Sequence, residues 1–427
     1  MLWIIWSISL LGLIYCAYHA YIILRGSLTK LDPIPYARPE KRLAVVIPAR
    51  NEARVVGGLV SSLKRQHYPK ALYDIYVVPN NCTDDTEAAA RKAGARILHC
   101  QSPVHSKGEV LSATFERLLK APEKYDGFII FDADNVADRG FLQAANNALC
   151  AGYQVGQAYR DSKNPNDSWV AGCTSVFFWF MNRLFNQPRA ALGLSSPLNG
   201  TGILIGAQML RQHGYRTFAL TEDLEFTAQC ALAGVKIAWM PEAITYDEQP
   251  IKFKDSWTQR RRWAAGTRQC LVKYGLPLYK KAGQSRICLD MALHFSGVVV
   301  QMLSLIPGIL TAVLLGMEIA ADPMRGLGHA LAALVLWVCG CVLGGMALVL
   351  LVCLLEKKFC RERLVDMAAM GWYLLTWLPA NIVGNLLPAP KWKEIPHVSQ
   401  AERCIRDSWA CMPGACAPSA AACSAWT

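Results

Sequence analysis

Apolar residues gather near both ends of the chain, in runs long enough to cross a bilayer. The first run extends from Leu2 to Leu24 and consists mostly of Leu, Ile, Trp and Tyr, about the length that a membrane-spanning helix needs. It has no basic segment before it and no small-residue cleavage site, so we interpret it as an anchor rather than a removable signal. Because Arg25 and Lys30 follow it, the positive-inside tendency predicts that its C-terminal end is cytoplasmic.

Three further apolar runs lie in the C-terminal part of the chain, at residues 287–317, 328–355 and 367–387. Lysines and arginines precede the first of them and follow the second, so these two runs are expected to form a hairpin whose ends are cytoplasmic. The third run contains Thr376, Pro379 and two asparagines. It is therefore either a poorer membrane span or a helix that lies in the interface.

Between these apolar regions, short apolar runs alternate with longer amphipathic ones. The short runs are expected to be strands buried on both faces, at 43–48, 74–78, 95–98 and 127–131. Helical spacing is found between them, at 52–63, 84–93 and 107–119. This order predicts an α/β fold with a doubly wound, mainly parallel sheet, flanked by transmembrane helices. In such sheets ligands bind beyond the carboxyl ends of the strands.

These patterns divide the chain into four expected parts. They are a transmembrane helix (1–25), an α/β domain (40–285) that includes an interfacial helix near 254–275, a group of transmembrane or interfacial helices (286–390) and a tail (391–427). The tail is rich in Ala and Ser and has no periodicity. We expect it to be partly disordered.

Composition agrees with this division. Hydrophobic residues make up 53% of the 427 residues, which indicates that part of the chain dissolves in lipid and leaves a globular domain of about 250 residues. The net charge is +12. In a membrane protein, the simplest explanation of excess Lys and Arg is that they keep their segments on the cytoplasmic side and contact anionic lipid. Nucleic-acid binding is not expected, because no basic stripe interleaves with aromatic residues. The 16 cysteines show no CxxC pairs, so they are interpreted as buried apolar residues in a reducing compartment.

Two acidic patterns carry candidate chemistry. Asp132 and Asp134 lie one residue apart after an expected strand, an arrangement that suits a hard cation bridging a diphosphate, although an Asx turn has the same pattern. Glu222 and Asp223 precede an apolar run. A lone carboxylate there can act as a general base, or the acids can simply favour a helix N-terminus.

Seven short motifs occur in an order that is found in a known family. They are VVIPARNE (45–52), NNCTDDT (80–86), SKGEVL (106–111), DADN (132–135), NGTG (199–202), TED (221–223) and QRRRW (259–263). Over about half of its length the chain thus resembles the membrane-embedded members of glycosyltransferase family 2, a GT-A-fold group that includes hyaluronan, chitin, cellulose and poly-N-acetylglucosamine synthases and ceramide glucosyltransferase. The resemblance implies a GT-A fold, a UDP-sugar donor and an Mg²⁺ or Mn²⁺ cofactor.

The resemblance also implies a donor site. Asp132 and Asp134 would hold the metal, and Asp132 would also contact the nucleotide-sugar diphosphate. The other residues expected at the nucleotide-sugar are Pro48, Ala49, Arg50, Glu52, Asn80 and Lys107. The sequence departs from the family at Asn80 and Asn81, where relatives often have Asp. A carboxamide offers both an acceptor and a donor to uracil, so uridine recognition is compatible with this change.

On the acceptor side, the resemblance makes Asp223 the general base, with Glu222 beside it. Asp223 would take the proton from the acceptor hydroxyl as that oxygen attacks the anomeric carbon opposite the departing UDP, which inverts the anomeric centre. The loop of Asn199, Gly200 and Thr201 precedes an apolar run. It is a candidate acceptor loop, and a plain turn is the alternative.

Gln259, Arg262 and Trp263 resemble the family's QxxRW signature. It implies that Trp263 stacks on an acceptor sugar ring, while Gln259 and Arg262 address the pyrophosphate and the acceptor. An amphipathic interfacial helix whose arginines face lipid phosphates is the alternative, and both can hold together. Further on, Lys391, Trp392 and His397 resemble a tail motif that covers the nucleotide pocket in polymerising relatives; interfacial anchoring of the tryptophan is the alternative there.

We therefore expect a multi-pass protein of the cell membrane with a cytoplasmic, metal-dependent and inverting catalytic domain. It would transfer a hexosyl or N-acetylhexosaminyl group from a UDP-sugar to a growing polysaccharide. The alternative is a single transfer onto a lipid acceptor. A catalytically silent membrane scaffold is a third hypothesis, of a different class.

Overall fold

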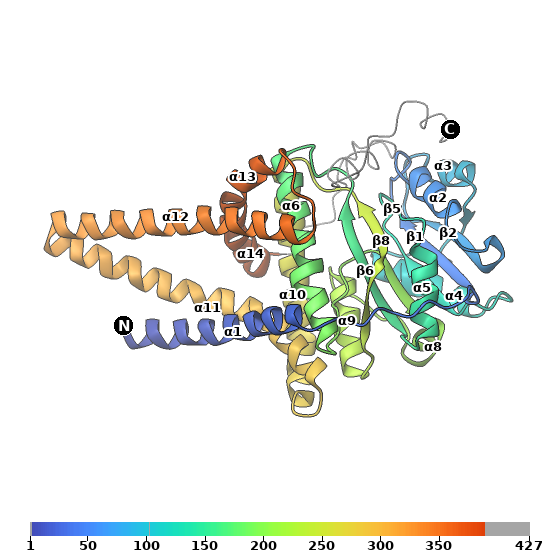
Figure 1. The fold of residues 1–427 in the computed structure, drawn as a ribbon, viewed down its shortest axis with the longest axis horizontal. Coiled ribbons are helices and arrows are strands. Elements are labelled where there is room, and N and C mark those ends of the chain that lie inside the picture. Colours follow the sequence, from blue (N-terminus) through green and yellow to red (C-terminus); the bar gives the residue numbers. More distant parts are fainter. Residues whose placement is uncertain (1, 102, 389–427) are drawn as a thin grey trace.

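The computed structural model describes residues 2–101 and 103–388. Three of the described helices are long and apolar enough to cross a membrane: α1 (Leu2–Leu28), α11 (Arg286–Ala321) and α12 (Pro323–Leu355). They project together from one side of an α/β domain (Figure 1). α1 packs along α11, and α11 packs along α12. Many of their large apolar side chains are exposed, above all in α1 and α12, as lipid contact requires.

One mixed sheet of eight strands forms the centre of the domain, in the order β3-β2-β1-β4-β7-β6-β8-β5. The strands are β1 (Leu43–Ala49), β2 (Tyr73–Pro79), β3 (Arg96–Ile97), β4 (Gly127–Ile130), β5 (Val136–Ala137), β6 (Val155–Ser162), β7 (Ile203–Gly206) and β8 (Ile237–Asp247). β1 to β4 are parallel to one another, and β6 is parallel to β8. β7 runs antiparallel between β4 and β6, and β5 runs antiparallel to β8. The predicted α/β fold with a mainly parallel sheet is therefore confirmed.

The half of the sheet made of β1 to β4 follows the predicted pattern closely. Its helices are α2 (Val56–Lys64), α3 (Thr86–Ala93) and α4 (Lys107–Leu119), with a short 3-10 helix at Lys70–Leu72. Successive residues of β1 enter two different apolar cores: Val45 and Ile47 lie in one, Ala44 and Val46 in the other. Burial on both faces is why the strand sequences are continuously apolar.

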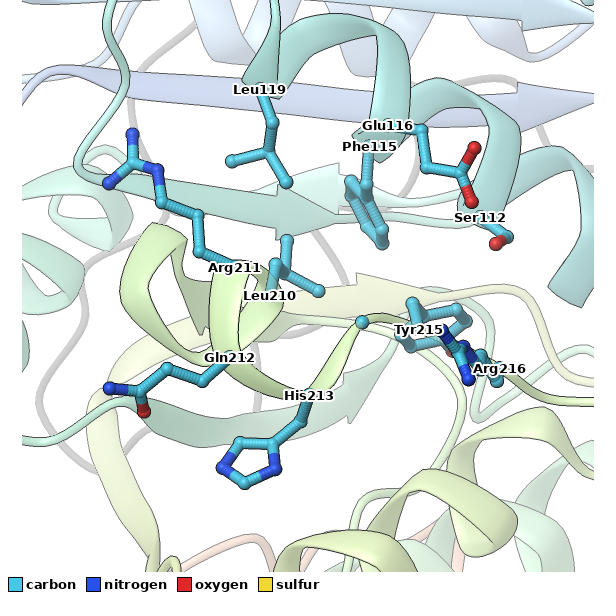
Figure 2. Close-up of a pocket in the computed structure, with 11 residues that line it drawn as sticks. Ser112, Phe115, Glu116, Leu119, Leu210, Arg211, Gln212, His213, Tyr215 and Arg216 are labelled. Carbon is cyan, nitrogen blue, oxygen red and sulfur yellow. The ribbon is translucent and has the colours of Figure 1, made fainter.

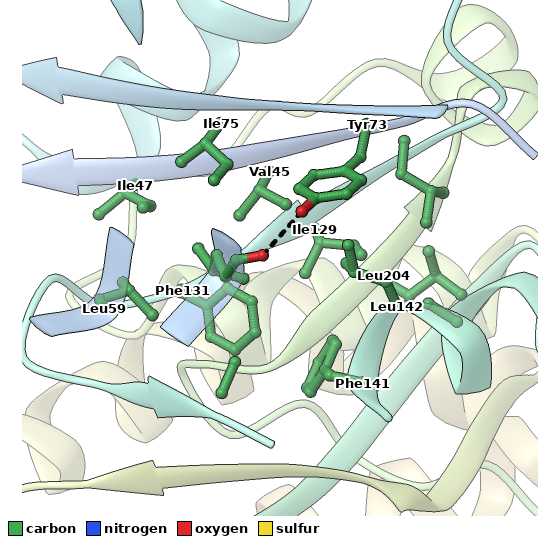
Figure 3. Packing of buried hydrophobic residues seen from close by; sticks show 14 of the residues in the cluster. Val45, Ile47, Leu59, Tyr73, Ile75, Ile129, Phe131, Phe141, Leu142 and Leu204 are labelled. Carbon is green, nitrogen blue, oxygen red and sulfur yellow. Dashed lines mark hydrogen bonds between the residues drawn. The ribbon is translucent and has the colours of Figure 1, made fainter. Parts of the chain in front are cut away.

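Figure 3 shows the first of these cores. Val45 and Ile47 pack there against Leu59 of α2 and Phe131 beyond β4. The hydroxyl of Tyr73 donates a hydrogen bond of 3.0 Å to the carbonyl of Leu63 (Figure 3). An apolar core with its few polar groups paired holds the strand ends at one edge of the sheet.

The other half of the domain contains several helices that the sequence pattern did not assign, together with α9 (Glu222–Leu232) and α10 (Phe253–Lys281), which coincide with the possible helix start at Glu222 and the helix expected near 254–275. After α5 (Phe141–Cys150) come α6 (Trp169–Phe180), a π-helix (Met181–Asn186), α7 (Gln187–Ala191) and α8 (Ala207–His213), followed by α9 and α10. α6 is almost wholly apolar, and it packs on β6, on α12 and on the helix Arg363–Leu375 that follows α12. It therefore joins the sheet to the membrane region.

The third apolar run forms two short helices, α13 (Arg363–Leu375) and α14 (Trp377–Leu386). A helix of 13 residues is only about 20 Å long, too short for a bilayer core of about 30 Å. α13 packs on α6 and α12, and α14 packs on α10. Of the two alternatives for this run, the structure favours interfacial helices over a membrane span.

α10 carries the QRRRW motif and passes close to the first residue before α9. At Gly266 of α10, a Cβ atom would lie only 2.6 Å from Cγ2 of Thr221. This distance is too short for any real contact, so only glycine allows the two helices to approach in this way. The tail residues Lys391, Trp392 and His397, like the rest of 389–427, lie outside the described residues.

Candidate active site

The expected donor residues lie at one edge of the sheet because β1, β2 and β4 are parallel neighbours. They lie at or just after the carboxyl ends of these strands; they are Pro48, Ala49, Arg50, Glu52, Asn80, Asp132 and Asp134. The amide of Asn80 donates to the carbonyl of Ala49 at 2.9 Å. The amide of Glu52 donates to Oγ1 of Thr86 at 2.8 Å. The loops after β1 and β2 are thus fastened to each other.

Asp84 of the NNCTDDT motif has a local structural task. Its carboxylate accepts hydrogen bonds from the amides of Ala53 and Thr86, both at 3.1 Å. Burial acts to raise the pKa of Asp84, but the hydrogen bonds from Thr86 and Ala53 outweigh it and lower the pKa. Asn81 has φ = 51°, and its amide group donates to the carbonyl of Val104 at 3.2 Å. These hydrogen bonds therefore hold the loop that follows β2 at the edge of the sheet where the expected donor residues lie.

Lys107 connects three of the predicted motifs. It is the first residue of α4, whose N-cap Ser106 accepts a hydrogen bond from the Glu109 amide. Its Nζ lies 2.6 Å from Oδ1 of Asp132 and 3.0 Å from Oε1 of Glu222. It also donates to the carbonyl of Gly200 at 2.8 Å. Burial acts to lower the pKa of Lys107, but the two carboxylates outweigh it and raise the pKa. This ammonium therefore remains charged.

The DADN and NGTG motifs are also bonded to each other. The amide of Asp132 donates to Oγ1 of Thr201 at 3.1 Å, and the Thr201 hydroxyl donates to the side chain of Asn135. Asn135 in turn donates to Asp134 at 3.2 Å. The backbone amide of Asn135 also donates a hydrogen bond to the carbonyl of Asp132, which closes a turn. The geometry of this motif is therefore compatible with both interpretations given above, a turn after the strand and a pair of acids that binds a cation.

The carboxylates of Asp132 and Asp134 are the side chains that would hold the implied divalent cation. Asp132 is 38% exposed, so its carboxylate is accessible to solvent. We refer to the region around Lys107, where Asp132, Glu222 and the carbonyl of Gly200 meet, as the cleft. Within the described part of the chain there is no group of three or more His, Cys, Asp or Glu residues that could hold a metal ion. Two aspartates without further side-chain ligands do not make a closed protein cage. They fit a magnesium-like ion that takes its other oxygen ligands from a diphosphate and water.

Asp223 lies in the first turn of α9, facing the same cleft. Burial first, and then the charge of Glu222, raise its pKa to about 7, while Lys107 and Arg160 act in the opposite direction. A Cβ atom at Gly200, which has φ = 93°, would lie 3.8 Å from Oδ2 of Asp223. The acceptor loop therefore runs directly beside this acid. Asp223 therefore lies at a helix N-terminus and can also act as a base, so the two alternatives for this residue do not exclude each other.

Arg160 and Asp247 belong to the site although the sequence did not reveal them. Arg160, on β6, donates from Nε to Oδ2 of Asp247 at 2.7 Å and from Nη1 to the carbonyl of Asn199 at 2.7 Å. Its guanidinium lies 3.8 Å from the ring centroid of Phe178, and its side chain is 11% exposed. No motif surrounds either residue. The one available signal was a charged residue at the end of an apolar run.

Trp263 lies in an aromatic cluster made of Phe177, Phe178, Trp263 and Trp377. Its ring is stacked at 6.2 Å from Phe177, packs edge-on to Phe178 at 6.0 Å and lies 6.2 Å from Trp377. Since Phe178 also contacts Arg160, the cluster extends from the cleft to α14. Stacking of Trp263 on an acceptor sugar stays a prediction.

The other members of the QRRRW motif divide between two environments. Gln259 and Arg262 are half-buried, and Oε1 of Gln259 has no hydrogen-bond partner among the described residues. Arg260 is fully buried instead, donates to Oγ1 of Thr376 at 2.8 Å, and lies over the Tyr373 ring at 4.6 Å. Arg260 therefore fastens α10 to the interfacial helices.

A separate cavity of about 430 Å³ lies between α4 and the C-terminal part of α8 with the residues that follow it. Phe115, Leu210 and Tyr215 line it, and Glu116, Arg211 and His213 lie around it (Figure 2). It contains none of the predicted site residues. The predicted residues meet around Lys107 instead, and we take that region as the candidate active site.

Residues 39–266, more than half of the chain, match the family described as Glycosyltransferase like family 2. The chain belongs to this family. Among curated proteins, the glycosyltransferase is 26% identical over 268 residues to "Probable glycosyltransferase YdaM" of Bacillus subtilis (strain 168), covering 60% of this chain and 61% of that protein. It is 25% identical over 298 residues to "Beta-monoglucosyldiacylglycerol synthase" of Trichormus variabilis, covering 67% and 61%. The glycosyltransferase thus spans about three-fifths of the length of these relatives.

Its fold is similar to that of a solved structure, the mannosyltransferase PcManGT from Pyrobaculum calidifontis in complex with GDP-Man and Mn²⁺. The TM-score is 0.59 at 16% identity, covering 89% of the glycosyltransferase and 98% of that chain. This likeness establishes the GT-A fold.

Proposed function

We propose that this family 2 glycosyltransferase transfers a single sugar from a nucleotide-sugar to a lipid-borne acceptor at the membrane surface. The observation that carries the proposal is the contact of Lys107 with both Asp132 and Glu222. It brings the expected diphosphate site and the expected base into one cleft. The aromatic cluster around Trp263 leads from this cleft to the interfacial helices.

Asp223 has the properties that a general base needs. With a pKa of about 7, it is ionised in a large fraction of molecules at neutral pH and still accepts a proton well. In the proposed reaction it takes the proton of an acceptor hydroxyl, whose oxygen forms a bond to the anomeric carbon. The bond from that carbon to the diphosphate breaks, and the nucleoside diphosphate leaves from the opposite face.

The leaving diphosphate is anionic, and the cleft holds positive charge to receive it. Lys107 and Arg160 lie beside the acidic residues there. Fixed charges that match the charge developing in a transition state stabilise it without reorganisation. An Mg²⁺ or Mn²⁺ ion held by Asp132 and Asp134 would supply further neutralisation of the diphosphate.

We propose UDP as the nucleotide of the donor. Asn80 lies at the carboxyl end of β2, beside Ala49 and close to Arg50, where a base can meet a carboxamide. GDP is the competing choice, because the fold relative was solved with GDP-Man. A donor panel distinguishes these nucleotides directly.

The lipid acceptor is now favoured over the polysaccharide that the sequence first suggested. α1, α11 and α12 lie in a row, in which α11 is packed between the other two (Figure 1). A row of three helices is a less suitable path for a secreted polymer than a closed bundle. A relative named as a glycolipid synthase also supports the lipid alternative.

We also propose a multi-pass orientation with the catalytic domain in the cytoplasm. α1 and α12 both end on the side of the domain (Figure 1). Arg25 lies in the last turn of α1, and Lys357 and Lys358 follow α12. Basic residues at these ends are what the positive-inside tendency predicts for a cytoplasmic side.

The test uses the full-length protein in liposomes that contain diacylglycerol or monoglycosylated lipid, with labelled UDP-glucose, UDP-N-acetylglucosamine and GDP-mannose. Nucleotide release is measured, and the product is extracted into organic solvent and sized. We expect one labelled glycolipid from one donor, and none from the Asp223→Asn variant. A ladder of water-soluble polymer would overturn the lipid acceptor. Absence of nucleotide release with every donor would overturn the whole proposal.

A further inference from the structure

The last residues of β6 face two different regions of the protein. Successive side chains of a strand point to opposite faces, and Arg160 points into the cleft while Tyr159 and Asp161 point away from it. The pairing of β6 with β8 is irregular between Ala158 and Tyr159. Irregularities of this kind re-aim side chains near active sites.

Tyr159 and Asp161 are bound by the residues that follow α12. Nζ of Lys358 lies 2.6 Å from Oδ2 of Asp161. The hydroxyl of Tyr159 donates to the carboxylate of Glu356. The indole of Trp179 on α6 donates to the other oxygen of Asp161 at 2.7 Å, so both oxygens of this carboxylate are engaged. Asp161 is only 7% exposed, which makes these contacts desolvated.

The main chain of Arg160 is held from the same side. Asn182, in the π-helix, donates from Nδ2 to the carbonyl of Arg160 at 2.8 Å. Arg183 of the π-helix also lies 3.9 Å from Glu356. The π-helix, α6 and the end of α12 thus form one support around three consecutive residues of β6. π-helical turns are rare and occur frequently at functional sites.

A gain in the stability of the fold is a weak explanation for the ion pair of Lys358 with Asp161. A buried ion pair is often no more stabilising than well-packed apolar residues of similar size. What the pair does provide is a defined position, because Lys358 must meet Asp161 and Trp179 at the same time; its Nζ lies 4.5 Å from the Trp179 ring centroid.

We propose that Glu356 and Lys358 are positioning residues for Arg160, so that the end of the transmembrane hairpin α11–α12 is part of the construction of the catalytic cleft. Both residues lie outside the segment 39–266 that matches the family. The inference rests on the proposed function in one respect, since Arg160 affects transfer only if the cleft is where transfer occurs. The structural part of the inference is independent of the reaction.

Arg160 has two tasks that a displaced β6 would lose. It holds the acceptor loop through the carbonyl of Asn199, and it faces Asp223. The charged groups around Asp223 are Glu222 on its own helix, Lys107 from α4 and Arg160 from β6, with Tyr215 and Cys270 as titratable neighbours. Arg160 lowers the pKa of Asp223. Its displacement would therefore move the acidic limb of the pH–rate profile to higher pH.

The experiment compares three variants of the full-length protein in liposomes. Lys358→Met removes the charge and keeps a long apolar side chain, while Lys358→Arg keeps the charge. Lys357→Met is the matched control, because Lys357 is an exposed neighbour that forms no ion pair within the described residues. We measure kcat, the KM for the nucleotide-sugar, the pH profile and the thermal midpoint of unfolding.

For Lys358→Met we expect kcat to fall by about 10- to 100-fold, as a small misplacement can cause, with a nearly unchanged KM for the donor and an acidic limb at higher pH. Lys358→Arg should restore most of the rate, and Lys357→Met should behave like the wild type. Wild-type kcat and pH profile in Lys358→Met would overturn the proposal. So would equal losses in the Met and Arg variants together with a lower unfolding midpoint, because these indicate a general structural role.

Hydrogen–deuterium exchange separates this proposal from the proposed function. Amides of 155–162 and 197–202 should exchange faster in Lys358→Met than in the wild type and in Lys357→Met. If the wild type transfers no sugar, the proposed function fails, but this comparison still decides whether Lys358 positions β6. Unchanged exchange in both segments would overturn the positioning role whatever the activity.

Discussion

The two halves of the sheet place their charged residues in different ways. In the half made of β1 to β4, repeated strand–helix units bring short motifs to one edge, and apolar cores on both faces hold them there. In the half made of β6, β7 and β8, strand directions are mixed, and charged residues are placed by pairs distant in sequence, such as Arg160 with Asp247. Functional residues that repeated strand–helix units bring together can be found as short sequence motifs, whereas pairs of residues far apart in sequence cannot.

The difference is also energetic. The first half depends on apolar burial, which is non-directional and tolerates modest changes of shape. The second half buries charged side chains, among them Arg160, Asp247 and Asp161. Removing one partner of a buried pair leaves an uncompensated charge, which costs about 3–5 kcal/mol. We therefore expect the half nearest the membrane helices to be the less tolerant of substitution.

The largest expected effect tests the half that contains the base. Asp223→Asn keeps the size of the side chain but cannot accept the proton, so kcat should fall by about 10²- to 10⁴-fold. Binding of UDP should remain, because Asp132 and Lys107 are intact. Sugar transfer and calorimetric UDP binding are measured on the same preparation. A variant with undiminished kcat would mean that the base lies elsewhere.

The next effect tests the donor half. Asp132→Asn removes one of the two expected metal ligands and a partner of Lys107, so UDP binding in the presence of Mn²⁺ should weaken by roughly 100-fold. Addition of EDTA to the wild type should have a similar effect. Glu116→Gln, in the separate cavity, is the control and should bind normally. Equal UDP affinity in wild type and Asp132→Asn would remove the metal assignment.

The pH dependence sharpens the comparison, because the two halves meet at Asp223. A base must be deprotonated to act, so kcat/KM should rise with pH through about 7, the pKa of Asp223. The charge of Glu222 raises that pKa, so Glu222→Gln should move the acidic limb to lower pH. The rate is measured from pH 5 to pH 9 at saturating metal. A limb that stays in place would show that another group controls the rate.

The smallest effect is expected on the donor side, at Asn81. Its backbone has φ = 51°, which both Asn and Asp tolerate. Asn81→Asp loses the hydrogen bond to the Val104 carbonyl, so the free energy of unfolding should fall by about 1 kcal/mol while kcat changes little. Thermal unfolding in detergent measures the first, and transfer assays the second. A large loss of kcat would contradict a mainly structural role.

The sequence predicted the donor half well because its pattern is local. The expected strand 43–48 corresponds to β1 (Leu43–Ala49), and the expected helix 107–119 is identical in extent to α4. Asp132 could therefore be placed after the end of a strand, and Lys107 at the start of a helix. Their direct contact could not be foreseen, since it depends on how the loop of Gly200 folds back.

The other half was only partly predictable. The motifs made Asp223 and Trp263 candidates, but α6 and the π-helix have no repeating polar pattern, because both are packed between the sheet and the helices of the membrane region. Arg160 and Asp247 lie 87 positions apart, beyond the reach of any local pattern. The break at Thr376, which turns an apparent span into two short helices, likewise depends on packing against α10.

The missing side chain at Gly266 has a consequence for the choice of acceptor. It lets α10 lie against Thr221, the residue just before Glu222 and Asp223, so this close approach, together with the ion pair of Lys273 with Glu225, sets where the two acids lie along α10. If Asp223 is the base, a hydroxyl reaches it only when its head group extends to that position. The glycosyltransferase would then select its lipid by reach as much as by chemistry.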